Sequence, residues 1–334
     1  MKVAAPEKCS WYSFIDEPLI SGLNYAPRFS SPNVIMPEES CDGKWHMFFH
    51  SWIGIHHFIS DSGIAWQPRK MIELRGHCPF IYREGETYYL LYEKHNRNIP
   101  IIDQRRTDGK NEGFSRIEMR ISTDLLSWSM PRLLLDSRNV PSSKDGLENP
   151  RLSNPQLFRT DTGYRLYFGS SSVTLDDSRH TFPRYFGFAS SEDIMGPYVV
   201  NGSDDTLVES DGDDKWTNLA PGNIRLIRDE ECFYAFQTSA YWDSEEKRTK
   251  SAVNILKSED GISFERCTSK PIMIPAQEGW ARGYITSCDA HYREAEKCWY
   301  CYFCADTGTK GFYYFESIGL LIGNSLNQKK IVCF

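Results

Sequence analysis

Short apolar runs separated by polar turns recur along the whole chain, and their spacing is the main structural signal in the sequence. The most continuous runs occupy residues 45–52, 88–92, 164–168, 232–236 and 298–304. Runs of this length are too short for helices. Because they lack strict alternation of apolar and polar residues, they are typical of strands covered on both faces. The pattern therefore predicts an all-β chain.

A polar turn closed by an aromatic residue follows a further apolar run in four copies, at residues 60–66, 122–128, 190–198 and 258–264. The leading serines of these copies are 62, 68 and 68 positions apart. Serine and aspartate side chains bond the backbone of such turns, so each copy is a hairpin signal. A hairpin at a nearly constant period indicates a repeat architecture. A more degenerate fifth copy lies around residues 312–318.

A third element completes each repeat. A small or polar residue followed by proline opens a short strand at 31–35, 78–82, 154–158 and 220–224, and alanine replaces the proline at 289–292. Proline is tolerated at the first residue of a strand. Three recognisable strands and an outer fourth strand in five copies predict a five-bladed β-propeller, a single domain spanning residues 1–334. Either the run 11–15, within an N-terminal segment 1–28, or the run 330–334 is expected to close the ring.

Composition narrows the possible partners and the location. The formal charge is −7, from 38 basic and 45 acidic residues, so we expect no nucleic acid partner. No apolar run approaches the roughly 18 residues of a membrane span, so we expect no membrane partner. The first eight residues lack the apolar core of a signal peptide, and ten cysteines are expected to stay reduced, which predicts a cytoplasmic protein. The oligomeric state is not encoded in any signal we recognise.

The proline-initiated strand, the apolar strand and the turn of the form Ser-x-Asp-Gly-Ile-x-Trp together resemble the five-bladed glycoside hydrolases of families 43, 62, 32, 68, 117 and 130. The resemblance is nearest to family 43 and covers about residues 29–320. It implies a glycoside hydrolase that acts on a small oligosaccharide in a central propeller pocket. It implies no required cofactor, although some relatives hold a central Ca²⁺.

The catalytic acids of family 43 have no counterparts at the matching positions. The family places an Asp base before the proline of blade one, an Asp that tunes the acid in blade three, and a Glu acid in blade four. The matching residues are Ser31, Asn154 and, in blade four, Leu219 or its neighbours Asn218 and Ala220, none of which is acidic. Serine and asparagine cannot serve as a general base at neutral pH, so the family mechanism does not carry over intact. A non-catalytic carbohydrate-binding propeller and a glycoside phosphorylase, as in family 130, are therefore the alternatives.

Two carboxylates and a histidine are the catalytic candidates. Asp289 takes the pre-proline position in the fifth copy, and His291 shares its strand face two residues later. Such a pair can exchange protons, or it can be a buried hydrogen bond in the channel wall or a histidine near a central cation. Glu148, in the loop before Asn154, is the candidate proton donor; its alternative role is to cap that loop.

Substrate-binding candidates lie near the strand ends. His77 precedes Cys78 in the blade-two position, and family 117 implies that a histidine there can act as the acid. Asn154 occupies the blade-three position, and Glu93 ends the second strand of blade two. Trp52 and Trp280 can stack on sugar rings or pack between blades. Arg105, in the long loop 95–116, can bind the carboxylate or phosphate of an acidic ligand or simply be solvated.

We expect no metal site from the cysteines. Cys301 would face away from Cys298 and Cys304 on a strand, and those two would lie about 20 Å apart at ~3.3 Å per residue.

Overall fold

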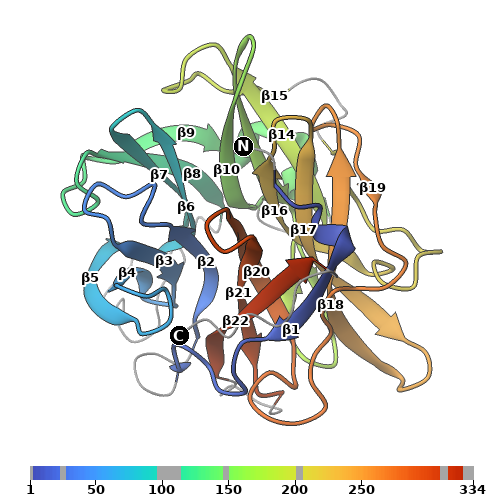
Figure 1. The fold of residues 1–334 in the computed structure, drawn as a ribbon. Coiled ribbons are helices and arrows are strands. Elements are labelled where there is room, and N and C mark those ends of the chain that lie inside the picture. The colour runs from blue at the N-terminus through green and yellow to red at the C-terminus, as the bar shows by residue number, and fades with distance from the viewer. Residues whose placement is uncertain are drawn as a thin grey trace, which may run out of the picture. The chain divides into compact units, whose positions relative to one another are not determined.

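The computed structural model describes residues 3–22, 28–95, 114–145, 150–200, 206–308 and 315–325, and of His95 only the backbone. These residues form short helices at η1 (Pro6–Lys8), η2 (Ser137–Asn139) and η3 (Pro141–Lys144), and are otherwise strands and turns. The described strands make five four-stranded antiparallel sheets (Figure 1). Sheets with this connectivity constitute a five-bladed β-propeller, which confirms the predicted fold class.

Blades one to three lie in one compact unit, residues 30–210. Blade one contains β2 (Ser30–Ile35), β3 (Trp45–His50), β4 (Gly54–Ser60) and β5 (Gln67–Leu74). Blade two contains β6 (Gly76–Glu84), β7 (Thr87–His95), β8 (Ser115–Ser122) and β9 (Arg132–Asp136). Blade three contains β10 (Leu152–Thr160), β11 (Gly163–Ser170), β14 (Tyr185–Ser191) and β15 (Val199–Val200), with a small hairpin of β12 (Val173–Thr174) and β13 (Thr181–Phe182).

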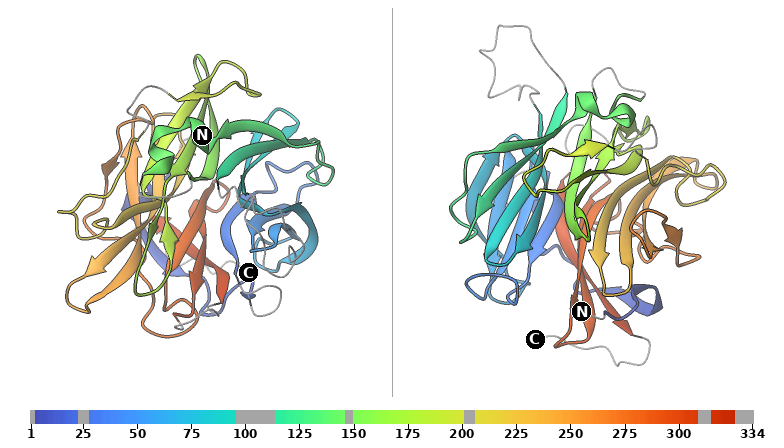
Figure 2. Two further views of the ribbon diagram at one scale, coloured as in Figure 1. Left: turned by 180° about the vertical axis from the view of Figure 1, so that it is seen from behind. Right: turned by 90° about the horizontal axis from the view of Figure 1, so that it is seen from above.

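Blades four and five belong to a second compact unit, residues 1–29 and 211–334. Blade four contains β16 (Ala220–Arg228), β17 (Phe233–Asp243), β18 (Arg248–Ser258) and β19 (Glu265–Arg266), drawn in yellow to orange in Figure 2. Blade five contains β20 (Ile285–Arg293), β21 (Cys298–Asp306), β22 (Glu316–Ser325) and β1 (Cys9–Ser13). That all 334 residues act as a single domain stays a prediction.

The N-terminal strand completes blade five. β1 pairs antiparallel with β22, from Cys9 opposite Ser325 to Ser13 opposite Leu321 (Figure 1). Trp11 lies over Gly323, where a Cβ would come within 2.9 Å of the indole ring, and its Nε1 donates to the carbonyl of Pro6 at 3.1 Å. The absence of a side chain at Gly323 therefore makes room for the indole. The run 11–15 supplies the closing strand, and the alternative run 330–334 lies outside the described residues.

The predicted polar turns are present between the third and fourth strands of their blades. In blade one, Ser60 Oγ accepts from the backbone N–H groups of Ser62 and Gly63. In blades two and four, Asp124 Oδ1 and Asp260 Oδ1 each accept from two backbone N–H groups. The backbone N–H groups of each turn thus find partners within the turn itself, which explains why the motif recurs.

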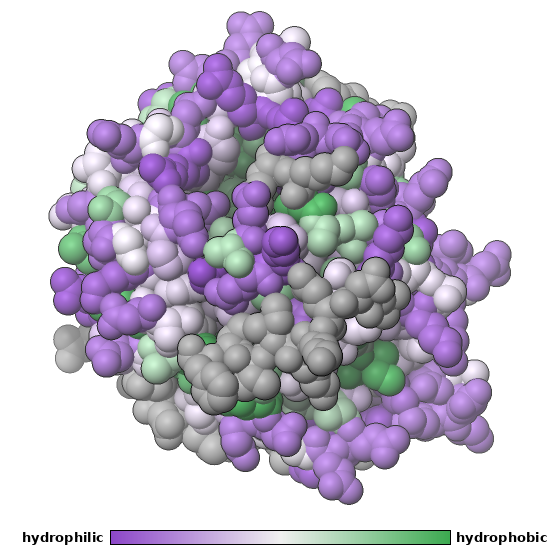
Figure 3. All heavy atoms as spheres, viewed as in Figure 1, coloured by the Kyte–Doolittle hydropathy of each residue, from purple (hydrophilic) through white to green (hydrophobic). Residues whose placement is uncertain are grey.

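Apolar side chains fill the space between strands within each unit. In blades two and three, Leu91, Leu157, Leu166 and Phe168 are fully buried in one cluster. In the other unit, Phe236, Trp299 and Phe303 belong to the corresponding cluster. Hydrophilic side chains dominate the face seen in Figure 3, with apolar groups scattered among them. Among the described residues, no helix has the length and hydropathy needed to cross a bilayer.

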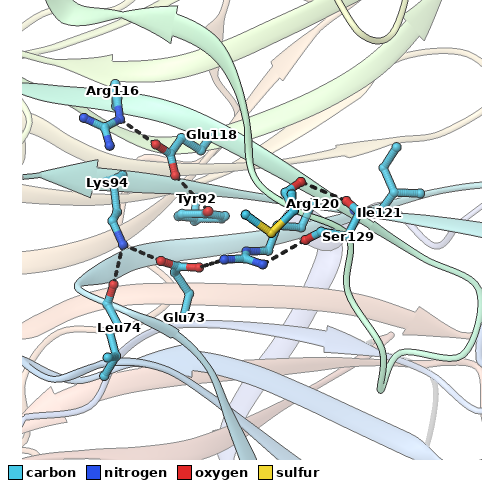
Figure 4. Close-up of polar contacts among 10 residues, drawn as sticks. Glu73, Leu74, Tyr92, Lys94, Arg116, Glu118, Arg120, Ile121 and Ser129 are labelled. Carbon is cyan, nitrogen blue, oxygen red and sulfur yellow. Dashed lines mark hydrogen bonds and ion pairs between the residues drawn. The ribbon is translucent and has the colours of Figure 1, made fainter.

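A charged network links β5 to blade two (Figure 4). Glu73 accepts from Lys94 Nζ and from Arg120 Nη2, one cation on each carboxylate oxygen. The side chain of Glu73 is 8% exposed, and those of Lys94 and Arg120 are 18% and 19% exposed. A neighbouring pair of bonds holds Glu118 between Arg116 and the hydroxyl of Tyr92. The network is well shielded from water, so its charges depend on one another.

Candidate functional site

Every blade has a register irregularity near the start of its first strand, which we call the bulged end of the blade. The breaks fall between Ser30 and Asn33, His77 and Phe80, Ser153 and Gln156, Ala220 and Asn223, and Ile285 and Ser287. In blades one to three the first of the two residues inside the break has a left-handed backbone, with φ of 52° at Ser31, 51° at Cys78 and 50° at Asn154. Non-glycine residues seldom adopt this conformation, and bulges of this kind re-aim side chains.

The three bulge side chains of blades one to three converge. The Ser31 hydroxyl lies 3.4 Å from Asn154 Oδ1 and 3.6 Å from Cys78 Sγ. Residues 47 and 123 positions apart in the sequence are thus brought within hydrogen-bonding distance. The short proline-initiated strands predicted from the sequence therefore place neutral polar groups, rather than carboxylates, at this point.

A buried carboxylate and an arginine lie beside the bulge residues. Glu93, on β7, has Oε2 3.9 Å from Cys78 Sγ. Arg151, just before β10, binds Glu93 with two donors, Nε to Oε1 at 3.1 Å and Nη2 to Oε2 at 3.4 Å. The side chain of Glu93 is 1% exposed and that of Arg151 is 27% exposed. Arg151 is therefore the more exposed partner of this ion pair.

Two histidines complete this site, which we call the Cys78 cluster: Ser31, His50, His77, Cys78, Glu93, Arg151 and Asn154. The backbone N–H of Cys78 donates to His50 Nδ1 at 3.1 Å, so the neutral His50 ring carries its proton on Nε2. The rings of His50 and His77 have centroids 4.7 Å apart. Ser31, Cys78 and Glu93 are buried, whereas His50, His77, Arg151 and Asn154 are partly exposed. The cluster thus combines three buried side chains with four partly exposed polar ones.

The thiol in the cluster is not a nucleophile at neutral pH. Burial, and next the negative charge of Glu93, raise the pKa of Cys78 to about 11. The reactive form of cysteine is the thiolate, so a thiol with this pKa stays protonated and inert at pH 7. The charge of Glu93 also raises the pKa of Arg151, which keeps the guanidinium protonated. Cys78 therefore contributes to the cluster as a hydrogen-bonding group.

The sequence alignment that placed Asp289 at the position equivalent to Ser31 is wrong. The break in β20 falls at Thr286, so Thr286, not Asp289, occupies the position equivalent to Ser31. Asp289 lies three residues further along β20, about 10 Å from the bulge at ~3.3 Å per residue. Its oxygens are engaged by Arg225 Nε at 3.1 Å and by His291 Nε2 at 2.7 Å. The predicted contact between Asp289 and His291 is present, and the catalytic role of the pair stays a prediction.

Blade five carries a further buried acid pair that the sequence analysis missed. Glu316 lies opposite Asp306 in the register of β22 and β21, and both are nearly inaccessible to solvent. Burial, followed by the charge of Asp306, raises the pKa of Glu316 to about 8, and the hydroxyl of Thr286 bonds it. Glu316 is therefore a carboxylic acid at neutral pH. Its position in the loosely patterned fifth repeat gave no local signal.

The remaining predicted side chains have different environments. Trp52, in the turn after β3, is 42% exposed. Trp280 stacks on Phe303, with ring centroids 5.4 Å apart, and fills the space above Gly319, which accounts for it as a packing residue. Sugar stacking by either tryptophan stays a prediction. Glu148 and Arg105 lie outside the described residues.

Four members of the Cys78 cluster, Ser31, His50, Cys78 and Arg151, were not among the predicted site residues. His50 ends the strand before Trp52, and Arg151 lies three residues before Asn154. A charged residue just ahead of a bulge position is a usable signal only once the bulge is known. Across the described residues, no three His, Cys, Asp or Glu side chains gather as a metal site.

No protein-family model matches this sequence, and neither does any curated protein. Solved structures do match its fold. A thermostable family-43 glycoside hydrolase aligns with a TM-score of 0.59 and 12% identity, over 91% of this chain and 94% of that chain. A family 117 glycoside hydrolase from the marine bacterium Zobellia galactanivorans aligns with a TM-score of 0.58 and 11% identity, over 98% and 94% of the two chains.

An N-acetylgalactosamine deacetylase from F. plautii, solved with blood group B trisaccharide, aligns with a TM-score of 0.58 and 14% identity, over 96% and 95% of the chains. At these identities the similarity establishes the fold alone. The chain therefore has the five-bladed propeller fold of these glycoside hydrolase structures, and the same fold also occurs in a deacetylase. Its activity has to be argued from its own residues.

Proposed function

We propose that this protein binds a small saccharide at the Cys78 cluster and hydrolyses a glycosidic bond. The observation that carries the proposal is the convergence of Ser31, Cys78 and Asn154 at the bulged ends of blades one to three. A left-handed backbone at three equivalent positions is a costly arrangement, and such outliers concentrate at binding and catalytic sites. The glycoside hydrolases among the structural neighbours support the same class of ligand.

The partly exposed side chains of the cluster suit a sugar. His77, Asn154 and Arg151 offer an imidazole, an amide and a guanidinium group, and all three are partly exposed. A few convergent polar groups are what small-molecule sites use to orient a ligand. Trp52 adds an exposed ring after β3 on which a sugar face can stack.

For the catalytic groups, the pair proposed from the sequence is Asp289 and Glu148. In that scheme Asp289 activates water, or attacks the anomeric carbon, while Glu148 or a histidine protonates the leaving oxygen. An inverting reaction needs carboxyl groups ~6.5–9.5 Å apart and a retaining one ~5–5.5 Å. Because both carboxylate oxygens of Asp289 are engaged, His291 oriented by Asp289 is the alternative base.

The second candidate is a non-catalytic sugar-binding protein of the same fold. The neutral side chains Ser31 and Asn154, together with the protonated thiol of Cys78, favour it because none of them can act as a base at neutral pH. A phosphorylase, the third candidate, would need an anion site, for which the sequence offers Arg105.

Hydrolysis of a broad panel of aryl glycosides and short oligosaccharides tests the proposal. The variants are Asp289→Asn and His291→Gln, the second of which leaves the ion pair with Arg225 in place, and Arg159→Gln is the surface control. We expect turnover by wild type and the control, and a loss of at least about 100-fold in Asp289→Asn or His291→Gln. Turnover unaffected by both variants would place the chemistry elsewhere, with Glu148 as the next candidate. Saturable sugar binding without turnover would leave the sugar-binding protein, and no binding would refute both.

A further inference from the structure

Two hydrogen-bond acceptors of the Cys78 cluster, the carboxylate of Glu93 and Oδ1 of Asn154, are already engaged within the protein. Both oxygens of Glu93 receive the guanidinium of Arg151. The Oδ1 atom of Asn154 lies 3.4 Å from the hydroxyl of Ser31. A ligand whose own groups are hydrogen-bond donors therefore finds its complementary acceptors in use.

The acceptor nitrogen of His50, the imidazole in the cluster whose tautomer the structure defines, is also engaged. His50 Nδ1 accepts the backbone N–H of Cys78 at 3.1 Å, so its remaining ring nitrogen is a donor when the ring is neutral. Protonation of either imidazole adds donors and positive charge. The carboxylate that balances this charge is nearly inaccessible, because the side chain of Glu93 is 1% exposed.

Arg151 supplies the donor whose orientation is most firmly fixed. Its Nε and Nη2 atoms bind Glu93, and among the described residues its Nη1 atom has no hydrogen-bond partner. The bidentate pairing with Glu93 holds the guanidinium plane, so a ligand loses little further side-chain entropy when it binds the outer edge. A planar guanidinium edge is the geometry that proteins use to bind carboxylates.

We propose that the Cys78 cluster selects a saccharide that carries a carboxylate, such as a uronic acid residue, and that Arg151 binds this carboxylate. The proposal rests on the proposed saccharide-binding function and names its substrate class. A sulfate ester presents the same negative charge with a different shape; we assign the carboxylate because it is planar. Nε and Nη2 of Arg151 are bound to Glu93, which leaves Nη1 as the donor for the ligand, and Glu93 neutralises part of the charge.

Matched pairs of methyl glycosides provide the test. Methyl glucuronide and methyl galacturonide are compared with methyl glucoside and methyl galactoside by isothermal calorimetry, together with the 6-sulfated galactoside. We expect the uronides to bind about 10- to 100-fold tighter, the usual effect of one charge-assisted hydrogen bond, with the preference reduced by salt.

The variants separate this role from folding. Arg151→Gln should abolish the preference for uronides, Arg151→Lys should retain part of it, and Arg159→Gln should leave it unchanged. Because Arg151→Gln leaves Glu93 buried without its partner, the double variant Glu93→Gln with Arg151→Gln removes both charges together and should also lose the preference. A double variant that folds and still prefers uronides would overturn the assignment of Arg151.

The outcomes also distinguish the inference from the proposed function. Equal affinity for neutral and acidic sugars, with both lost in Asn154→Ala, would overturn the selection for a carboxylate and leave saccharide binding intact. Tighter binding of the sulfated sugar than of the uronides would overturn the choice of a carboxylate. Absence of saturable binding by every glycoside would overturn the inference and the proposed function together.

Discussion

Removing the carboxylate of Glu73 should destabilise the protein much more than removing an exposed charge. In Glu73→Ala, Lys94 and Arg120 lose their shared partner in a region where each side chain is less than one-fifth exposed. Breaking a buried ion pair from one side costs about 3–5 kcal/mol, because the remaining charge is left uncompensated. Each cation keeps one backbone carbonyl, Leu74 at 2.6 Å for Lys94 and Ser129 at 2.8 Å for Arg120.

The expected loss is therefore at the lower end of that range, about 3 kcal/mol in the free energy of unfolding. With an unfolding entropy of about 2.1 cal/mol/K per residue over the chain, this corresponds to a fall in Tm of about 4 °C. Glu73→Gln keeps the side-chain volume and isolates the contribution of the charge. The matched control is Arg159→Gln, an exposed partner of Glu84 in the same unit, for which we expect a change below about 1 kcal/mol.

Urea unfolding followed by circular dichroism measures these differences. The argument from burial would be refuted if Glu73→Ala and Arg159→Gln cost the same, or if Glu73→Ala lost less than about 1 kcal/mol. A loss in Glu73→Ala that Glu73→Gln fully restores would show that packing, and not charge, is what Glu73 contributes.

Three further predictions concern pH and ring closure. Burial, with the nearby charge of His46, lowers the pKa of His57 to about 3, so the unfolded chain binds more protons than the folded protein between pH 6.5 and 3. Stability therefore falls across that window as the pH is lowered, and His57→Gln should flatten this fall by up to about 1.4 kcal/mol per pH unit in urea titrations. The raised pKa of Glu316, about 8, acts in the opposite sense, because the contribution of Glu316 to stability is complete below pH 4.5 and lost as the pH rises to 8. Glu316→Gln should therefore be more stable than wild type at pH 9, and an equal loss of stability with rising pH in both proteins would contradict this. Trp11→Ala should cost about 3 kcal/mol by removing the indole over Gly323, measured by urea unfolding, and a cost below about 1 kcal/mol would show that β1 closes blade five without it.

The strands could be predicted because their signals are local. An apolar run, a turn with serine or aspartate and a closing aromatic all lie within about ten residues, and each acts through its own backbone. The closing strand was narrowed to two runs for the same reason, since Trp11 lies in a recognisable β-run. Which run pairs with β22 depends on a partner at the other end of the chain, which no local pattern specifies.

The site was predicted less completely because its contacts are long-range. His77, Glu93 and Asn154 were predicted from their places at strand ends, and the structure brings them together around Cys78. Arg151 pairs with Glu93 across 58 residues, and nothing near Arg151 in the sequence indicates that partner.

The bulge positions could not be predicted from the sequence either, because a bulge is a property of the register between two strands. Matching Ala290 to the proline of the other repeats therefore shifted the fifth copy by three residues, and Asp289 was assigned a place that Thr286 holds. The alignment failed in the repeat that lacks its proline.

The pairing of β1 with β22 also determines when blade five can form during synthesis of the protein. Tyr12 and Asn324, which share a hydrogen bond across this pairing, are 312 residues apart. At about 5–20 residues per second, the ribosome needs roughly 15 to 60 s between making β1 and making its partner β22. During that interval β1, with Trp11 and Cys9, is an unpaired strand of the nascent chain, and blade five cannot be completed until β22 has been made.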